Sequence, residues 1–115
     1  MLSDVTSAVL NLIIEALDVN KVCQALYVQN ISKAMGDAQL KALVDVLKRK
    51  PKLWCLNIGE NYEISGEAWV WFCQSLPETN ITHLYVSEHV IPIALKNQMR
   101  DNIRWAFLHS RYYLI

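Results

Sequence analysis

The stretch from Leu53 to Asn61 constrains the fold of this 115-residue chain more than any other. Its apolar residues occupy the first, fourth and sixth places, and an asparagine occupies the ninth. Residues 23–31 and 81–89 keep apolar residues at the same three places, starting 30 residues earlier and 28 residues later. A pattern that recurs about every 28 to 30 residues indicates an internal repeat made of equivalent structural units. The alternation of apolar and other residues around the fourth and sixth places predicts a short strand in each of the three copies.

A helical pattern follows each of the first two copies. In residues 36–49 and 66–76, apolar residues recur at i, i+3, i+4 and i+7, which is one face of an α-helix. These apolar residues are Leu40, Leu43, Val44 and Leu47 in the first helix and Trp69, Phe72, Cys73 and Leu76 in the second. Asp37 and Ser65 are the expected N-caps. Because a helix separates successive strands, the strands are expected to be parallel.

The two ends of the chain extend this alternation to the order α-βα-βα-βα. A helix capped by Ser3 or Asp4 is expected to run to about Leu17, and a longer one is expected from Ile93 to His109. The expected organisation is a single domain, divided into an N-terminal helix at 1–20 and three units at 21–50, 51–78 and 79–115. The helix of the last unit is expected to cap the core, because terminal units of a repeat array must close it against water.

The chain resembles the ribonuclease-inhibitor-like branch of the leucine-rich-repeat proteins. The resemblance lies in the L-x-x-L-x-L-x-x-N spacing of Leu53–Asn61, in Met35-Gly36-Asp37-Ala38 at the start of a helix, and in Leu47-Lys48-Arg49-Lys50-Pro51 at its end. It implies an α/β fold, a short solenoid with parallel strands on the concave face and helices on the convex face. It also implies a non-catalytic protein–protein interaction module that acts as a scaffold for a protein or peptide partner.

Composition bounds the functional classes. The formal net charge is zero and 53% of the residues are hydrophobic, so no global charge favours nucleic acid, which is not expected as a partner. Three widely spaced cysteines do not suit a disulfide framework and favour a reducing compartment. The N-terminus lacks the basic region of a signal peptide, and no apolar run approaches the ~20 residues of a membrane helix. A cytoplasmic protein is expected, with the nucleus as an alternative.

Strand alternation predicts which side chains face the partner. Places three, five and seven of each copy point away from the core, and parallel pairing stacks equivalent places into ladders. The partner-binding residues predicted on the concave face are Tyr27, Gln29, Cys55, Asn57, His83, Tyr85 and Ser87. Tyrosines are frequent binding anchors because they combine a large buried area with a polar tip. The alternative is that these places form an exposed polar surface without a partner.

Cys55 and His83 are predicted ladder neighbours, which raises the question of a nucleophile or a metal site. A cysteine nucleophile needs a base within hydrogen-bond reach and a third, orienting group, and a zinc site needs four ligands. The sequence offers neither set, nor a phosphate-binding loop or paired carboxylates. We therefore expect no enzyme activity, no catalytic residue, no cofactor and no metal.

Other residues suggest further contacts. Val70 and Trp71 occupy solvent-facing places on their helix and predict a second surface, unless Trp71 lies flat across the neighbouring helix. Self-association through Trp71 or through the aromatic segment 105–115 is a further expectation; that segment would otherwise pack back on the last unit. The basic run 48–52 resembles a nuclear-import patch, although cations are also favourable at a helix C-terminus.

Two alternative functions remain open on the sequence. A basic stripe at Lys96, Arg100 and Arg104 would suit a membrane-surface adaptor, although a capping helix with a solvated face is the favoured explanation and a membrane is not the expected partner. The chain would otherwise be a regulatory fragment of a larger repeat-containing protein, such as a GTPase regulator or an enzyme-linked repeat protein. None of the loops after the three strands contains an arginine, which argues against GTPase activation by this chain.

Overall fold

The three short strands predicted from the repeat pair side by side. A computed structural model of the chain describes residues 6–31, 34–86, 91–103 and 113–114. The strands are β1 (Ala25–Tyr27), β2 (Cys55–Asn57) and β3 (His83–Tyr85), and they form a parallel sheet in the order of the sequence. Leu26, Leu56 and Leu84 are in register. The alignment of the three copies by apolar places is therefore also the register of the backbone pairing.

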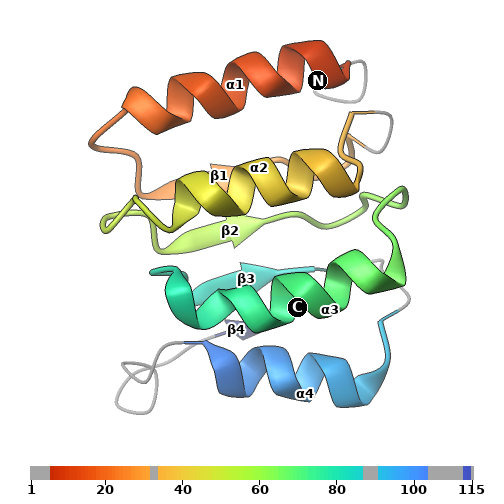
Figure 1. Cartoon of the computed structure of the whole chain (residues 1–115). Coiled ribbons are helices and arrows are strands. Elements are labelled where there is room, and N and C mark those ends of the chain that lie inside the picture. Colours follow the sequence, from red (N-terminus) through yellow and green to blue (C-terminus); the bar gives the residue numbers. More distant parts are fainter. Residues whose placement is uncertain (1–5, 32–33, 87–90, 104–112, 115) are drawn as a thin grey trace.

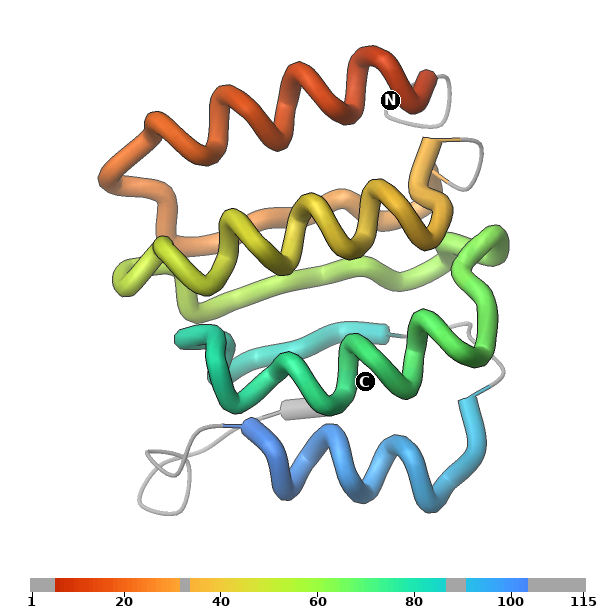
Figure 2. Tube along the Cα trace, viewed as in Figure 1, coloured from red at the N-terminus to blue at the C-terminus, as the bar shows by residue number. Residues whose placement is uncertain are grey.

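Helices cover one side of this sheet, which gives a two-layer, mixed α/β arrangement (Figure 1). They are α1 (Ser7–Val19), α2 (Asp37–Leu47), α3 (Gly66–Ser75), the short 3₁₀ helix η2 (Leu76–Glu78) and α4 (Ile93–Asn102). Each α-helix packs against the next one along the chain. The chain path alternates between the two layers, as Figure 2 shows, and the sheet does not close on itself. The predicted alternation of α-helices and strands is confirmed from α1 to α4.

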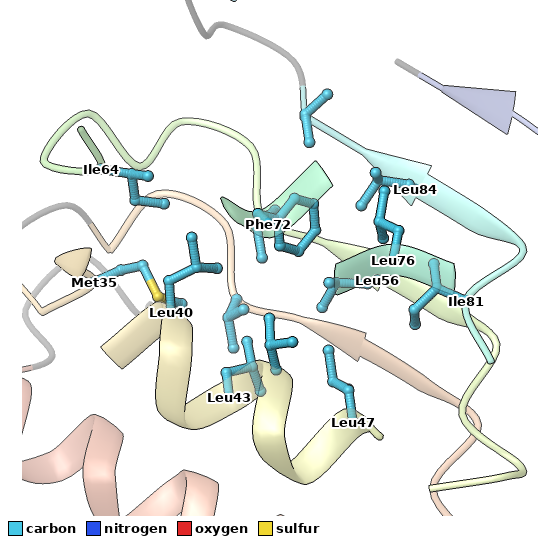
Figure 3. Packing of buried hydrophobic residues seen from close by; sticks show 14 of the residues in the cluster. Met35, Leu40, Leu43, Leu47, Leu56, Ile64, Phe72, Leu76, Ile81 and Leu84 are labelled. Atoms are coloured by element: carbon cyan, nitrogen blue, oxygen red, sulfur yellow. The ribbon is translucent and has the colours of Figure 1, made fainter. Parts of the chain in front are cut away.

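The core lies between the two layers. Figure 3 shows Leu40 and Leu43 of α2 and Phe72 of α3 directed into the same space as Leu56 of β2. Leu40 and Leu56 are completely buried, and Leu43 and Phe72 are 1% exposed. Trp69, which replaces a leucine at the equivalent place of α3, is also buried, as predicted. The i, i+3, i+4, i+7 pattern therefore identified the buried face of both central helices.

The helix N-termini agree only in part with the expected caps. Ser65 caps α3 as predicted, and its Oγ accepts a hydrogen bond of 3.1 Å from the backbone N–H of Ala68. The prediction for α2 is wrong, because Gly36 is the N-cap and Asp37 is the first helical residue. The prediction for α1 is also wrong, because this helix begins after Thr6, which caps it, and not after position 3 or 4.

Asp37 instead connects two successive units. Its Oδ1 accepts a hydrogen bond from the backbone N–H of Ser65 (2.8 Å), and its Oδ2 accepts one from the Ser65 hydroxyl (2.6 Å). These bonds from Ser65, the hydroxyl first, lower the pKa of the Asp37 carboxyl below its ordinary value of 3.8. The carboxylate of one unit therefore holds the capping residue of the next helix in place.

We expect the Asp37 contact to make stability depend on pH. Because the folded-state pKa lies below the unfolded value, the contribution is fully present above about pH 5 and is lost as the pH falls through the folded pKa. Asp37→Asn should cost about 1 kcal/mol at pH 7 and less near pH 2, where more of the carboxyl is protonated, after allowance for solvent exposure. Urea unfolding at both pH values measures this difference. Asp45→Asn, at an exposed site on the same helix, is the control, and an equal pH dependence in both variants would contradict the assignment.

Asn61, the ninth residue of the central copy, closes the turn after β2 from the inside. Its side chain is completely buried. Its Nδ2 donates to the backbone oxygens of Val28 (2.9 Å) and Ile58 (3.0 Å), and its Oδ1 accepts from the N–H of Ile31 (2.9 Å). Val28 and Ile31 belong to the preceding turn, so a single asparagine fixes two successive turns.

The backbone is left-handed at the eighth place of the first and second copies. Asn30 has φ of 57° and Glu60 has φ of 60°. Asparagine adopts this conformation more readily than most other residues with a side chain. This explains why the first copy has an asparagine at the eighth place, one residue before the place that Asn61 occupies in the second copy.

The C-terminal helix is shorter than predicted. Helix α4 ends at Asn102, because Ile103 has an extended backbone. The side chain of Asn102 donates a hydrogen bond of 3.0 Å to the backbone oxygen of Cys73, which attaches this end of α4 to α3. Beyond it, β4 (Tyr113–Leu114) pairs in parallel with β3. The expected helical residues 104–109 lie outside the described part of the chain.

Candidate functional site

The helices leave one side of the sheet uncovered, as Figure 1 shows. We call it the open face, and its residues form two ladders across β1, β2 and β3: Ala25, Cys55 and His83 in one, and Tyr27, Asn57 and Tyr85 in the other. None of the six is an aspartate, glutamate, lysine or arginine. The open face therefore offers aromatic surface and uncharged hydrogen-bonding groups.

Tyr27 is the most exposed of the large side chains of the open face, with 59% of its surface accessible. Its hydroxyl reaches toward β2, where the Cys55 thiol donates a weak hydrogen bond with an Sγ–Oη distance of 3.9 Å. A phenol has an ordinary pKa of about 10 and is protonated at neutral pH, so the Tyr27 hydroxyl is able to donate a hydrogen bond to a partner.

The prediction that Cys55 is exposed on this face is wrong. Cys55 holds the predicted place on β2 but is only 3% exposed. Because β2 is flanked by a strand on each side, the small thiol lies between larger neighbours, with the Tyr27 hydroxyl from β1 and His83 paired with it on β3. Gly59, at place seven of the same copy, is buried as well. The accessible surface of the central strand is therefore smaller than alternation alone predicts.

Asn57 lies in the middle of the tyrosine ladder and is held by its own neighbours. Its Nδ2 donates to Gln29 Oε1, and its Oδ1 accepts from the backbone N–H of Gly59 at 3.0 Å. Gln29 is exposed, whereas Asn57 and Tyr85 are half-buried. These amides are ordered before any partner arrives, which reduces the entropy lost on binding.

Trp54 is a residue of this region that sequence reasoning did not identify. Its side chain is 40% exposed, and its ring meets that of His83 edge to face, with centroids 4.8 Å apart and planes at 77°. His83 Nδ1 in turn lies 2.8 Å from Thr82 Oγ1. The signal in the sequence was a tryptophan at the second place of the central copy, beside the third place, where the next copy has His83. Aromatic side chains on neighbouring strands often contact each other.

Cys55 and His83 are in register, as predicted, but their surroundings differ from those of a nucleophile and its base. The Cys55 thiol is buried and donates to Tyr27, and His83 Nδ1 is bonded to Thr82. Burial keeps a substrate carbonyl away from Sγ, which a nucleophile must reach. In the described part of the chain, no group of three or more histidine, cysteine or acidic side chains is placed to hold a metal ion.

The second predicted surface is reduced to one residue. Val70 is 46% exposed, but Trp71 is half-buried and packs against the hydrophobic core. The Nζ of Lys41, on α2, lies 5.8 Å from the centre of the Trp71 ring, within the range of a cation–π contact. Trp71 therefore lies beside the neighbouring helix, as the alternative interpretation predicted.

Several remaining predictions concern the C-terminal third. Ser87, Arg104 and most of the aromatic segment lie outside the described residues. Of the basic stripe, Lys96 is half-buried, and Arg100 is exposed and donates to Asn97 Oδ1 at 3.1 Å. No helix within residues 6–31, 34–86 and 91–103 is long and apolar enough to cross a membrane.

No protein-family model matches the sequence, and no curated protein matches it either. Function must therefore be inferred from the side chains of the open face. Its main features are Tyr27 and Tyr85, the ordered amide of Asn57 between them, and the adjacent Trp54.

Proposed function

We propose that the chain is a short leucine-rich-repeat solenoid of the ribonuclease-inhibitor-like kind, with about three repeats. The spacing of 28 to 30 residues, the helix after each strand and the shared register of the three strands support this assignment. The hydrogen bonds of Asn61 support it further, because they join the turns of two successive copies through the ninth place of the motif. Proteins built in this way offer a continuous sheet as a binding surface.

The open face of this solenoid is, in our proposal, a binding surface for a protein or peptide, without catalysis. The observation that carries the proposal is the ladder of Tyr27, Asn57 and Tyr85, in which two aromatic residues flank an amide that is already ordered. Tyrosine loses little conformational entropy on binding and combines apolar area with a polar tip. The absence of formal charge in the two ladders favours a partner that is itself apolar and neutral at the contact.

The geometry favours a segment that crosses the strands. Parallel strands lie about 4.8 Å apart, so the backbones of Tyr27 and Tyr85 are separated by about 10 Å, with β2 between them. An apolar side chain placed over Asn57 would contact both rings. The backbone groups on either side of that side chain would then be within reach of the Tyr27 hydroxyl and the Gln29 amide.

Removing both aromatic rings tests this proposal. Peptides selected from a random display library against the full chain serve as probes, and calorimetry gives their dissociation constants. Tyr27→Ala/Tyr85→Ala is expected to weaken their binding by about 30-fold or more, as for the loss of two anchor residues. Circular dichroism and thermal unfolding verify that the variant is folded.

Tyr62→Ala is the matched control. Tyr62 is a comparably exposed tyrosine, at 62%, in the loop after β2 and outside both ladders. Its substitution is expected to change the dissociation constant by less than about twofold. Selected peptides that bind the double variant as tightly as the original chain would contradict the proposal.

A further inference from the structure

A cavity of about 370 Å³ is lined by residues at the end of α1 and in the segments that lead from α1 to β1 and from α2 to β2. The ends of α1 and α2 that these segments follow are at the left of Figure 1. None of its lining residues belongs to the two ladders of the open face. Its wall contains four cationic side chains, Lys21, Arg49, Lys50 and Lys52, and one carboxylate, Asp18. A volume of this size is within the range of small-molecule sites.

The single carboxylate is already neutralised within the wall. Arg49 Nε and Nη2 both donate to Asp18 Oδ1, at 3.2 and 2.9 Å. Lys21 and Lys52 are exposed and make no hydrogen bond or ion pair with the described residues. The cavity therefore has an excess of positive charge that its own wall does not compensate.

Lys50 adds a fixed, buried charge to this excess. It is only 8% exposed, and its Nζ donates to the backbone oxygens of Asp18 and Asn20, the latter at 2.6 Å. No carboxylate of the described residues lies within ion-pair distance of this ammonium group. A buried cation held only by carbonyl dipoles is costly, and a bound anion would offset that cost.

Most of the carbonyls at the end of α1, which would disfavour an anion if they were free, are bonded within the protein. The backbone N–H of Asn20 bonds to the oxygens of Ala16 and Leu17, both at 3.1 Å. Lys50 occupies the next carbonyls, those of Asp18 and Asn20. Among the last carbonyls of α1, those of Ala16, Leu17 and Asp18 are thus bonded without Lys21 or Lys52.

We propose that this cavity binds a small organic dianion, such as a dicarboxylate or a phosphate monoester. Lys50 supplies a positioned charge at the wall, and Lys21 and Lys52 supply flexible charges that close on the ligand. The half-exposed Cys23 and the aliphatic stems of the lysines would contact the apolar part of such a ligand. The site is separate from the proposed peptide-binding face and does not depend on it.

Succinate and phenyl phosphate are suitable probes, with uncharged succinamide as the ligand control. Titrated into the ¹⁵N-labelled full chain, either anion is expected to give saturable chemical-shift changes at the amides of Cys23 and Lys52, and succinamide is expected to give none. Comparison of the two anions distinguishes a carboxylate site from a phosphate site. The variant Lys21→Ala/Lys52→Ala should weaken binding by about tenfold or more, because it removes two nearby charges.

Lys96→Ala/Arg100→Ala is the matched control, because it changes the net charge equally but lies on α4. It should alter the dissociation constant by less than about twofold. The proposal is overturned if neither anion causes saturable shifts up to about 20 mM, or if both double variants weaken binding equally. Tyr27→Ala/Tyr85→Ala should leave anion binding unchanged, so failure at the open face and failure at the cavity are distinguishable.

Discussion

Replacing Asn61 with alanine is expected to lower the free energy of unfolding by about 3 kcal/mol. The substitution deletes three hydrogen bonds and leaves the N–H of Ile31 and the carbonyls of Val28 and Ile58 without this partner. Each such buried group costs about 1–3 kcal/mol, and less where water enters the space. Urea unfolding followed by tryptophan fluorescence measures the loss.

Asn57→Ala is the control for this experiment, because Asn57 is half-buried on the open face and should cost less than about 1 kcal/mol. Asn61→Asp keeps the acceptor for Ile31 but turns a carboxylate toward two carbonyl oxygens. It is therefore expected to be at least as destabilising as Asn61→Ala. Equal losses for Asn61→Ala and Asn57→Ala would show that Asn61 does not fix the two turns.

The strand register could be predicted because it is a property of repeated spacing. Leu26, Leu56 and Leu84 hold the fourth place of successive copies, and they are in register. A slip by one residue would turn these leucines to the open face and expose apolar surface. The hydrophobic pattern therefore specifies the register without knowledge of the loops.

Features that depend on contacts between units could not be predicted in the same way. Alternation assigns Cys55 to the open face but does not reveal that the Tyr27 hydroxyl lies beside its thiol. Asp37 suits an N-cap by residue type, yet Gly36 takes that role and the carboxylate bonds to Ser65, 28 residues away. Such outcomes depend on the size and position of side chains from the neighbouring unit, which spacing within one copy does not contain.

The basic run and the C-terminus illustrate two other limits. Within residues 48–52, the sequence alone does not distinguish the buried Lys50 from its exposed neighbours, because the carbonyls that hold it belong to Asp18 in α1 and to Asn20, the C-cap of that helix. Strand β4 spans two residues, which is too short for any periodicity to be recognised. The apolar pattern of α4 continues through Ile103 in sequence, although the backbone there is already extended.

Replacing the leucine at the fourth place of a copy with alanine should lower the free energy of unfolding by different amounts on different strands. Leu56→Ala, in the strand between β1 and β3, is expected to lower the free energy of unfolding by about 4 kcal/mol, whereas Leu26→Ala on β1 should cost about 2 kcal/mol. Leu56 is completely buried, but Leu26 is only half-buried, because β1 is paired on one side only among the described strands. Chemical unfolding of the two variants gives the difference.

Hydrogen exchange provides a second measurement of the same gradient. The amide of Ile58 donates to β3 and should exchange much more slowly than that of Leu26, whose strand forms the edge. Equal costs for Leu26→Ala and Leu56→Ala would mean that β1 is covered in solution. Since a second copy of the chain could cover it, light scattering at several concentrations belongs to the same experiment. If the protein is a monomer and the two variants lose equal free energy of unfolding, the packing argument is contradicted. That argument attributes the difference between Leu56 and Leu26 to the strands on both sides of β2.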